Sequence, residues 1–213
     1  MDPDAQVQMV QTLLSIYKHE GWLPDCHMSL CKGWTQGGSN ADVVIVDAYV
    51  KNLSSTIDWE VALAAVVKDA EEEPLEWSYH GRGGLQSWKS LDYIPYLDFD
   101  PVGFGTNSRS ISRTLEYAYD DFCISQLAQG LGKMGKHDKY ARSSMNWHNL
   151  WKEDQTSVIN GTDTGYKGFF QPKYMNGTWG YQDPIACSAL ADFCSLTTNP
   201  SETFEASVWQ YLL

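Results

Sequence analysis

Positive charge is scarce in this sequence. It has 15 Lys and Arg residues against 27 Asp and Glu, which gives a net charge of −12 with the histidines neutral. Nucleic-acid binding relies on Lys and Arg against phosphates, so this balance argues against a nucleic-acid partner. The charge is compatible with a neutral substrate or a metal ion.

Membrane and export signals are also missing. No apolar run approaches the length needed to span a bilayer, so we expect no membrane partner. The segment Met1-Asp2-Pro3-Asp4 is acidic and lacks the positive and apolar regions of a signal peptide. Three glycosylation sequons nevertheless favour the secretory pathway, with the cytosol as the alternative; they begin at Asn52, Asn160 and Asn176.

Metal-binding and phosphate-binding motifs are absent as well. The sequence has no zinc-like CxxC, no βαβ alternation and no phosphate-binding glycine motif. Histidines 27, 80 and 148 show no metal-ligand spacing. The cysteines either close two short disulfides, Cys26–Cys31 and Cys187–Cys194, with Cys123 left in a helix, or they remain thiols.

Aromatic residues, by contrast, are abundant. Nine Trp and twelve Tyr in an acidic chain suggest stacking surfaces for ring-shaped ligands such as sugars, or the filling of a large helical core. With 43% hydrophobic residues, the 213-residue chain can bury one substantial core, and no linker composition divides it.

The apolar periodicity predicts an array of helices. Residues 41–52 could be a buried strand, but we expect a helix with Asn40 as its N-cap, and Asp58 is expected to cap the next helix. Residues 151–184 are expected to be rich in loops. The predicted helices cover residues 5–20, 41–52, 59–72, 111–131, 137–150, 185–197 and 200–213.

The helix predicted at 111–131 is apolar on every side, which indicates a central position. It also carries Arg113, Glu116 and Asp120 at spacings of three and four, so these charges share one face. Charges on a central helix are costly unless they are paired or used. We therefore expect either a structural ion network or the edge of an active site.

Two neighbouring segments complete this picture. The glycines of Gly81-Arg82-Gly83-Gly84 allow the backbone to approach another helix or a ligand closely. The run Glu71-Glu72-Glu73 indicates the solvated end of a helix.

A series of fragments in a fixed order resembles the family 92 glycoside hydrolases, with a cysteine pattern most similar to the fungal branch. Each fragment alone is weak, but their joint order is specific and covers nearly the whole chain. The fragments are Gly21 to Pro24, Gly37 to Val44, Asp47 to Lys51, Gly81 to Leu85, Asp92 to Pro95, Ser112 to Phe122, Gly168 to Pro172, Phe204-Glu205 and Trp209 to Tyr211.

The resemblance implies an all-α fold that forms part of an (α/α)6 barrel. Family members are exo-acting α-mannosidases that invert configuration with the help of calcium, and we expect mannose-containing glycans of glycoproteins as substrates. Inversion needs two carboxyl groups about 6.5–9.5 Å apart. The resemblance also implies that residues 1–213 are a partial, truncated catalytic domain, without the N-terminal β-sandwich domain and the C-terminal part of the barrel.

The resemblance assigns the general acid to Glu205, because the family motif around the acid corresponds to Phe204 to Tyr211. A carboxyl between Phe204 and Trp209 would be partly desolvated, which raises its pKa as a general acid requires. Without the resemblance, Glu205 would be a routine first-turn glutamate of a helix.

Two further residues are expected to bind substrate. Asp42 would accept hydrogen bonds from sugar hydroxyls, or would simply begin a helix. Arg82 would donate to sugar oxygens, or would form a structural ion pair. Possible sugar platforms, or else packing residues, are Trp22, Trp34, Trp147 and Trp179.

Nothing in the sequence matches the family's general base or its calcium-binding segments, so the metal ligands are unknown. We therefore expect the chain alone to be nearly inactive and to self-associate through exposed barrel faces. The alternatives are a non-catalytic mannose-binding or glycan-binding remnant and a helical scaffold.

Overall fold

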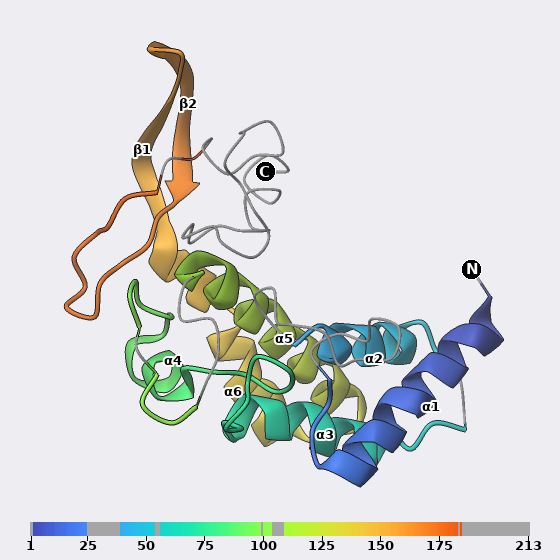
Figure 1. Cartoon of the computed structure of the whole chain (residues 1–213). Helices are drawn as coiled ribbons and strands as arrows, with labels where there is room; N and C mark the ends of the chain where they lie inside the picture. The colour runs from blue at the N-terminus through green and yellow to red at the C-terminus, as the bar shows by residue number, and fades with distance from the viewer. Residues whose placement is uncertain are drawn as a thin grey trace.

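The computed structural model describes residues 2–24, 39–53, 56–98, 100–103, 109–182 and 184. These residues form mostly helices with one small two-stranded sheet (Figure 1). The elements in chain order are α1 Pro3–Glu20, α2 Asn40–Val50, α3 Trp59–Glu71, α4 Leu85–Leu91, α5 Ser110–Gly130, α6 Met134–Ser143, the 3-10 helix η1 Asn146–Leu150, β1 Trp151–Ile159 and β2 Thr162–Phe170.

The first helices begin and end at the residues that their sequence signals indicate. The Asp2 carboxylate accepts the first backbone N–H groups of α1, and Gly21 ends the helix with a φ of 82°. Asp58 accepts the N–H of Val61 at the start of α3, as predicted. Residues 40–50 form a helix rather than a strand, but the residue before its first turn is Ser39, not Asn40.

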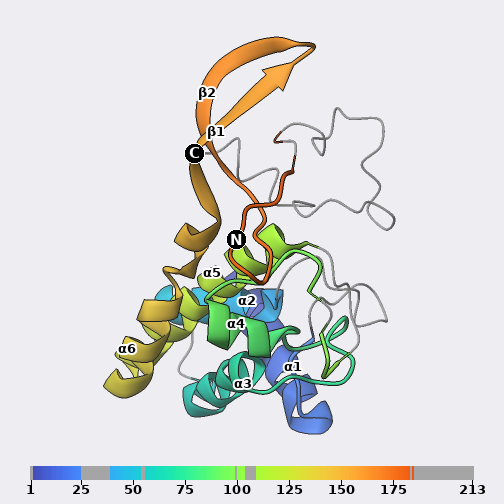
Figure 2. The same ribbon diagram turned by 90° about the vertical axis from the view of Figure 1, so that its left-hand side faces the viewer.

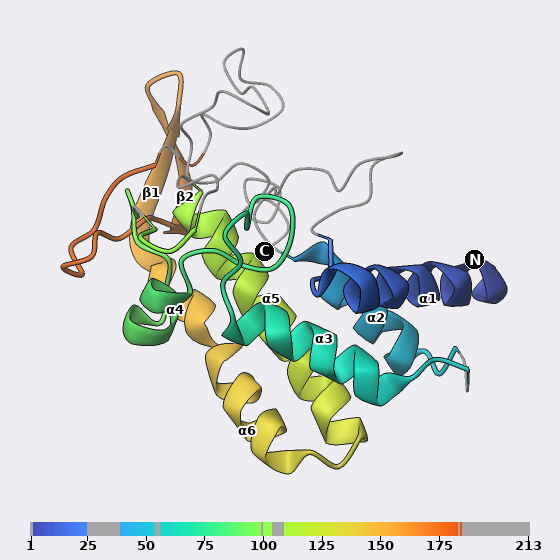
Figure 3. The ribbon, with the colours of Figure 1, turned by 60° about the horizontal axis from the view of Figure 1, so that its bottom comes forward.

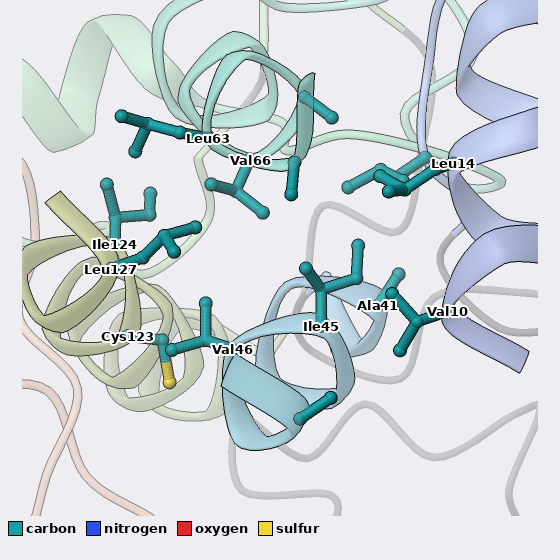
Figure 4. Close-up of a cluster of buried hydrophobic side chains, with 14 of the residues drawn as sticks. Val10, Leu14, Ala41, Ile45, Val46, Leu63, Val66, Cys123, Ile124 and Leu127 are labelled. Carbon is teal, nitrogen blue, oxygen red and sulfur yellow. The ribbon is translucent and has the colours of Figure 1, made fainter. Parts of the chain in front are cut away.

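Helix α5 is the central element of the described fold, as predicted. It contacts α2 and α3 on one side and α6 on the other (Figure 3). The main core lies between α1, α2, α3 and α5, where residues such as Val10, Ile45, Val66 and Ile124 have no exposed surface (Figure 4). The helix is not apolar and buried on every side, because Tyr119 and Phe122 are 47% and 46% exposed and stack on one another.

The prediction of a loop-rich segment after residue 150 is wrong for residues 151–170. Strands β1 and β2 form an antiparallel hairpin that stands away from the helices (Figures 1 and 2). Most residues of both strands are exposed or half-buried, so the hairpin has no buried face to impose an apolar alternation on the sequence. The signal that could have found it is Asn160-Gly161, a dipeptide typical of two-residue hairpin turns.

The helix predicted at residues 137–150 is also wrong in extent. Helix α6 ends at Ser143, and a separate 3-10 turn, η1, begins at Asn146. The hydroxyl of Ser144 donates to the carbonyl of Ala141, and the amide of Asn149 donates to that of Asn146. Such local side-chain bonds compete with a continuous helix.

The base of the hairpin is tied to α5 by a small apolar cluster. Ile111 of α5, Leu150 of η1 and Phe170 of β2 are buried together. The predicted helices at 185–197 and 200–213 lie outside the described residues, as do Glu205, Trp34, His27 and four of the cysteines. Cys123 is a buried thiol in α5. None of the helices in the described ranges combines the length and hydropathy of a membrane span.

Candidate functional site

Arg82 lies at the centre of a buried cluster of carboxyl groups. Its guanidinium Nη1 donates to Asp121 at 2.6 Å and its Nη2 to Asp42 at 3.2 Å, while Nε lies 3.6 Å from Asp120. None of these side chains is more than 2% exposed. Three segments therefore meet at one cation: the start of α2, the glycine loop before α4, and the middle of α5.

Ser39 links a fourth carboxyl group, that of Asp69, to this cluster. Its hydroxyl donates to Asp69 of α3 at 3.0 Å, and Asp42 lies within 3.4 Å of the same oxygen. The backbone N–H of Ser39 donates to Asp120 at 3.4 Å. The residue that precedes α2 thus joins α2, α3 and α5 through polar contacts.

One guanidinium cannot balance four buried carboxylates, and the pKa values of three of these carboxyl groups are raised. Burial raises the pKa of Asp42 to about 7, against the opposing influence of Arg82. Burial, and then the negative charge of Asp42, raises the pKa of Asp69 well above its usual range. Burial likewise raises the pKa of Asp120. Burial thus favours the neutral form of these three carboxyl groups over the charged form.

Asp42 and Arg82 are buried in this structure and bonded to each other, so neither is free to contact a substrate. Of the charges predicted on α5, Asp120 belongs to the cluster. Arg113 instead lies 5.2 Å from the centre of the Trp77 ring, and Glu116 is half-buried with a pKa raised by burial. The sequence indicated Asp42 and Arg82, whose contact with a sugar stays a prediction.

Residues that the sequence reading missed complete the cluster. Asp121 makes the shortest contact to Arg82, and its other oxygen accepts a 2.5 Å hydrogen bond from Ser143 of α6. The ring of Tyr117 lies 5.4 Å from the Arg82 guanidinium. Asp121 follows Asp120 directly and lies off the face defined by the three-and-four spacing, which is why that pattern did not find it.

Next to this cluster is a cavity of about 510 Å³ between α3, α4 and α6. Asp121 and Ser143 contribute to its lining, together with Glu71, Lys89 and Tyr140. Glu71 accepts from Lys139 at 2.5 Å and from Tyr140 at 2.7 Å. Although burial opposes it, the contact with Lys139 lowers the pKa of Glu71. The cavity presents charged and hydroxyl groups, which suit a small polar ligand.

A second pair of carboxyl groups lies on the other side of the glycine loop. Glu73 accepts hydrogen bonds from the N–H groups of Gly84 and Leu85, at 3.0 and 2.9 Å. Burial, and then a hydrogen bond to Asp100, raises the pKa of Glu73 to about 8. Asp100 also accepts from the indole N–H of Trp77 at 2.6 Å. The prediction of a solvated helix end is therefore wrong for Glu71 and Glu73.

The glycines of this loop allow a close approach, as the sequence predicted. A Cβ on Gly83 would overlap the indole of Trp77, and one on Gly81 would come within 2.9 Å of Pro74. The neighbours are other parts of the same fold, so these glycines position the backbone on either side of Arg82.

The predicted sugar platforms have different environments. Trp147 packs against Phe170, and Trp22 lies between His80 and Lys68. Trp179 is 38% exposed, with the ammonium of Lys173 at 4.2 Å from its ring centre. Trp22 and Trp147 are half-buried, so Trp179 is the most exposed of these three side chains.

The described residues do not fit the calcium ion that the resemblance implies. No set of three or more His, Cys, Asp or Glu side chains within the described ranges is arranged to hold a metal ion. The carboxylates around Arg82 already face a fixed positive charge.

Comparison with known proteins gives consistent results. A family model described as the glycosyl hydrolase family 92 catalytic domain matches residues 1–213. An uncharacterized secreted glycosidase of the fungus Arthroderma benhamiae is 65% identical over 198 residues, which are 93% of this chain and 26% of that protein.

Solved structures show the same relationship. The family GH92 inverting mannosidase BT2199 from Bacteroides thetaiotaomicron VPI-5482 superimposes with a TM-score of 0.70 at 27% identity, over 84% of this chain and 21% of that chain. The α-mannosidase BT3965 from the same species, in complex with mannoimidazole, gives a TM-score of 0.62 at 21% identity, over 89% and 22% of the two chains. The chain thus spans about a quarter or less of the length of these relatives.

Proposed function

The chain belongs to glycoside hydrolase family 92, and on that premise we propose that it forms part of an exo-α-mannosidase that removes terminal mannose from glycoprotein glycans with inversion. The observation that supports the mannoside assignment best is the similarity to the inverting mannosidase BT2199, at 27% identity over 84% of this chain. The mannoimidazole complex of BT3965 agrees with a mannoside ligand.

In this proposal Glu205 protonates the leaving oxygen, and a second carboxylate activates water on the opposite face of the sugar. The second carboxylate and the calcium ligands come from outside the described residues. We propose that the described helices form one sector of an (α/α)6 barrel, to which α5 and α6, which pack against one another, would contribute a neighbouring pair. The secreted fungal relative supports a secretory location.

In this proposal the buried cluster around Arg82 has a structural role: it holds the elements of the catalytic domain in place. Arg82 fixes the glycine loop that carries it relative to the start of α2 and to α5, because Asp42, Asp120 and Asp121 on those helices face its guanidinium. Asp42 and Arg82 would reach a sugar only if the segments around them opened. Self-association through exposed helix faces remains part of the proposal.

A chimera tests this assignment. The corresponding segment of the Arthroderma relative is replaced by this chain, and the chimera, the relative and the isolated chain are incubated with α-1,2-mannobiose and calcium. Proton NMR then identifies the first anomer of mannose that is released. We expect the relative and the chimera to release β-mannose, and the isolated chain to release little.

The variant Glu205→Gln in the chimera should lose activity by about 10²-fold or more, the size of a general-acid contribution. Glu202→Gln, a change of the same chemistry three residues away in sequence, should retain it. A Glu205→Gln chimera as active as the unmodified chimera would overturn the acid assignment. An active relative with an inactive chimera would overturn the assignment of this chain to the catalytic unit.

A further inference from the structure

The hairpin β1–β2 ends in a turn that carries a glycosylation sequon. Asn160 and Gly161 form the turn with φ angles of 49° and 79°, and Thr162 begins the returning strand. Two consecutive positive φ angles are typical of the type I′ hairpin turn. The hairpin rises away from the helices in two perpendicular views (Figures 1 and 2), so the sequon Asn160-Gly161-Thr162 lies at its outer end.

We propose that Asn160 carries an N-linked oligosaccharide. Its side chain is exposed and makes no hydrogen bond with the described residues. A Cβ built on the adjacent Gly161 would meet nothing within 4 Å, which shows that the space around the turn is open. A bulky, solvated group can therefore be attached here without displacing any described part of the fold.

Exposed apolar side chains on the hairpin are a second, independent reason to expect a glycan at its turn. Next to the turn, Val158 and Ile159 are 50% and 51% exposed, and Tyr166 on the returning strand is 72% exposed. Both strands are edge strands, because the described sheet contains only these two. Exposed apolar side chains beside unpaired strand edges promote association between chains. A glycan on Asn160 would shield apolar side chains next to the turn, where Val158 and Ile159 project from opposite faces of β1.

The Asn176 sequon shares the exposed asparagine and the open neighbouring glycine, since a Cβ on Gly177 would also meet nothing within 4 Å, but it does not lie on the hairpin. The Asn176 side-chain oxygen accepts from both the N–H and the hydroxyl of Thr178, so its amide is held in a local turn. Asn52 follows the end of α2, and the third residue of its sequon, Ser54, lies outside the described ranges. Neither lies on the projecting hairpin, which is why we place the modification at Asn160.

The modification rests on the proposed secretory location. The donor would be an oligosaccharide linked to a lipid diphosphate. The side-chain nitrogen of Asn160 forms a bond to the anomeric carbon of the first sugar. The bond from that carbon to the diphosphate oxygen breaks, the lipid diphosphate leaves, and the amide loses one proton to the transferase.

The test expresses the chain behind a cleavable secretion leader in a eukaryotic host. The leader directs the chain into the secretory pathway whatever its natural location. An unmodified Asn160 would therefore contradict this proposal alone, and would not bear on the mannosidase assignment or on natural secretion. Peptide N-glycosidase treatment followed by mass spectrometry locates the modified asparagines. We expect Asn160 to be occupied, and Asn160→Gln and Thr162→Val each to lose one glycan on a gel.

Asn176→Gln serves as the matched control and should retain the Asn160 glycan. An unmodified Asn160 in the secreted wild-type chain, or an Asn160→Gln variant with an unchanged glycan count, overturns the proposal. Light scattering tests the covering role: Asn160→Gln should aggregate faster than wild type, and adding Val158→Ser and Ile159→Ser should reverse that change. Equal aggregation of wild type and Asn160→Gln contradicts the covering role.

Discussion

Arg82 Nη1 donates to Asp121 Oδ1 at 2.6 Å across 39 positions of sequence, and neither side chain is more than 2% exposed. This contact fixes the glycine loop against the middle of α5. Because the same guanidinium also bonds Asp42, the position of α2 depends on it too. The cluster is therefore a structural node of the described fold.

The first prediction concerns this node. Arg82→Leu should lower the free energy of unfolding by about 3–5 kcal/mol, because it leaves buried carboxyl groups without their cation. Urea denaturation followed by Trp fluorescence measures the change. The control is Lys51→Leu, which removes the exposed pair with Asp47 and should cost about 1 kcal/mol or less. Equal losses in the two variants would show that the cluster is not a node.

The second prediction concerns pH. The pKa of Glu73 is raised from 4.5 to about 8, so in this range the folded state holds a proton that the unfolded state has lost. The free energy of unfolding should therefore fall as the pH rises through this window, and the contribution of Glu73 is fully present below its unfolded pKa. Asp42, Asp69 and Asp120, whose pKa values are also raised, act in the same direction.

Glu73→Gln should make the fall in stability between pH 5 and 8 visibly shallower, since its amide does not titrate. Melting temperatures measured across that range provide the comparison. Glu72→Gln, on the neighbouring exposed residue, should leave the slope as in wild type. A Glu73→Gln slope identical to that of wild type would contradict the role of the Glu73–Asp100 pair.

The third prediction compares two glycines. Gly83→Ala places a methyl group inside the indole of Trp77 and should cost about 1–3 kcal/mol by overpacking. Gly135→Ala, in α6 with nothing within 4 Å of the new Cβ, should raise stability by up to about 1 kcal/mol. Thermal unfolding of both variants gives the sign of each change, and a neutral Gly83→Ala would argue against the close contact.

The fourth prediction separates the two sides of α5. Ile124 has no exposed surface, and Ile124→Ala should cost about 2–5 kcal/mol. Phe122 is 46% exposed, and Phe122→Ala should change stability by only about 0.5 kcal/mol. Denaturant titration distinguishes the two, and a large loss for Phe122→Ala would indicate that this face is covered in solution.

The elements with local signals were predictable from the sequence. Asp58 and Gly21 mark the boundaries of α3 and α1 because a cap and a left-handed glycine act on their own helix. The hairpin was missed because its strands are largely solvated, so that only the turn at Asn160 carried a pattern.

The contacts of the site depend on tertiary structure and were therefore harder to predict from the sequence. Asp42 and Arg82 were each predicted to bind substrate, but the bond between them joins positions 40 residues apart, which no local pattern could predict. Glu73 is a residue type usually found at the surface, and its partners Gly84, Leu85 and Asp100 come from later parts of the chain. No local pattern encodes such a return of the chain. Glu205 lies outside the described residues and stays a prediction.

The hydroxyl of Tyr117 lies 3.0 Å from both the N–H and the carbonyl oxygen of Gly83, and bonds to each. A side chain of α5 thus satisfies both backbone groups of Gly83, as a partner strand does in a sheet. Any rotation of that helix about its axis must then carry the loop with it, or leave both backbone groups without their partner. Whatever displaces α5 is thereby constrained to move this helix and the arginine-bearing loop in concert.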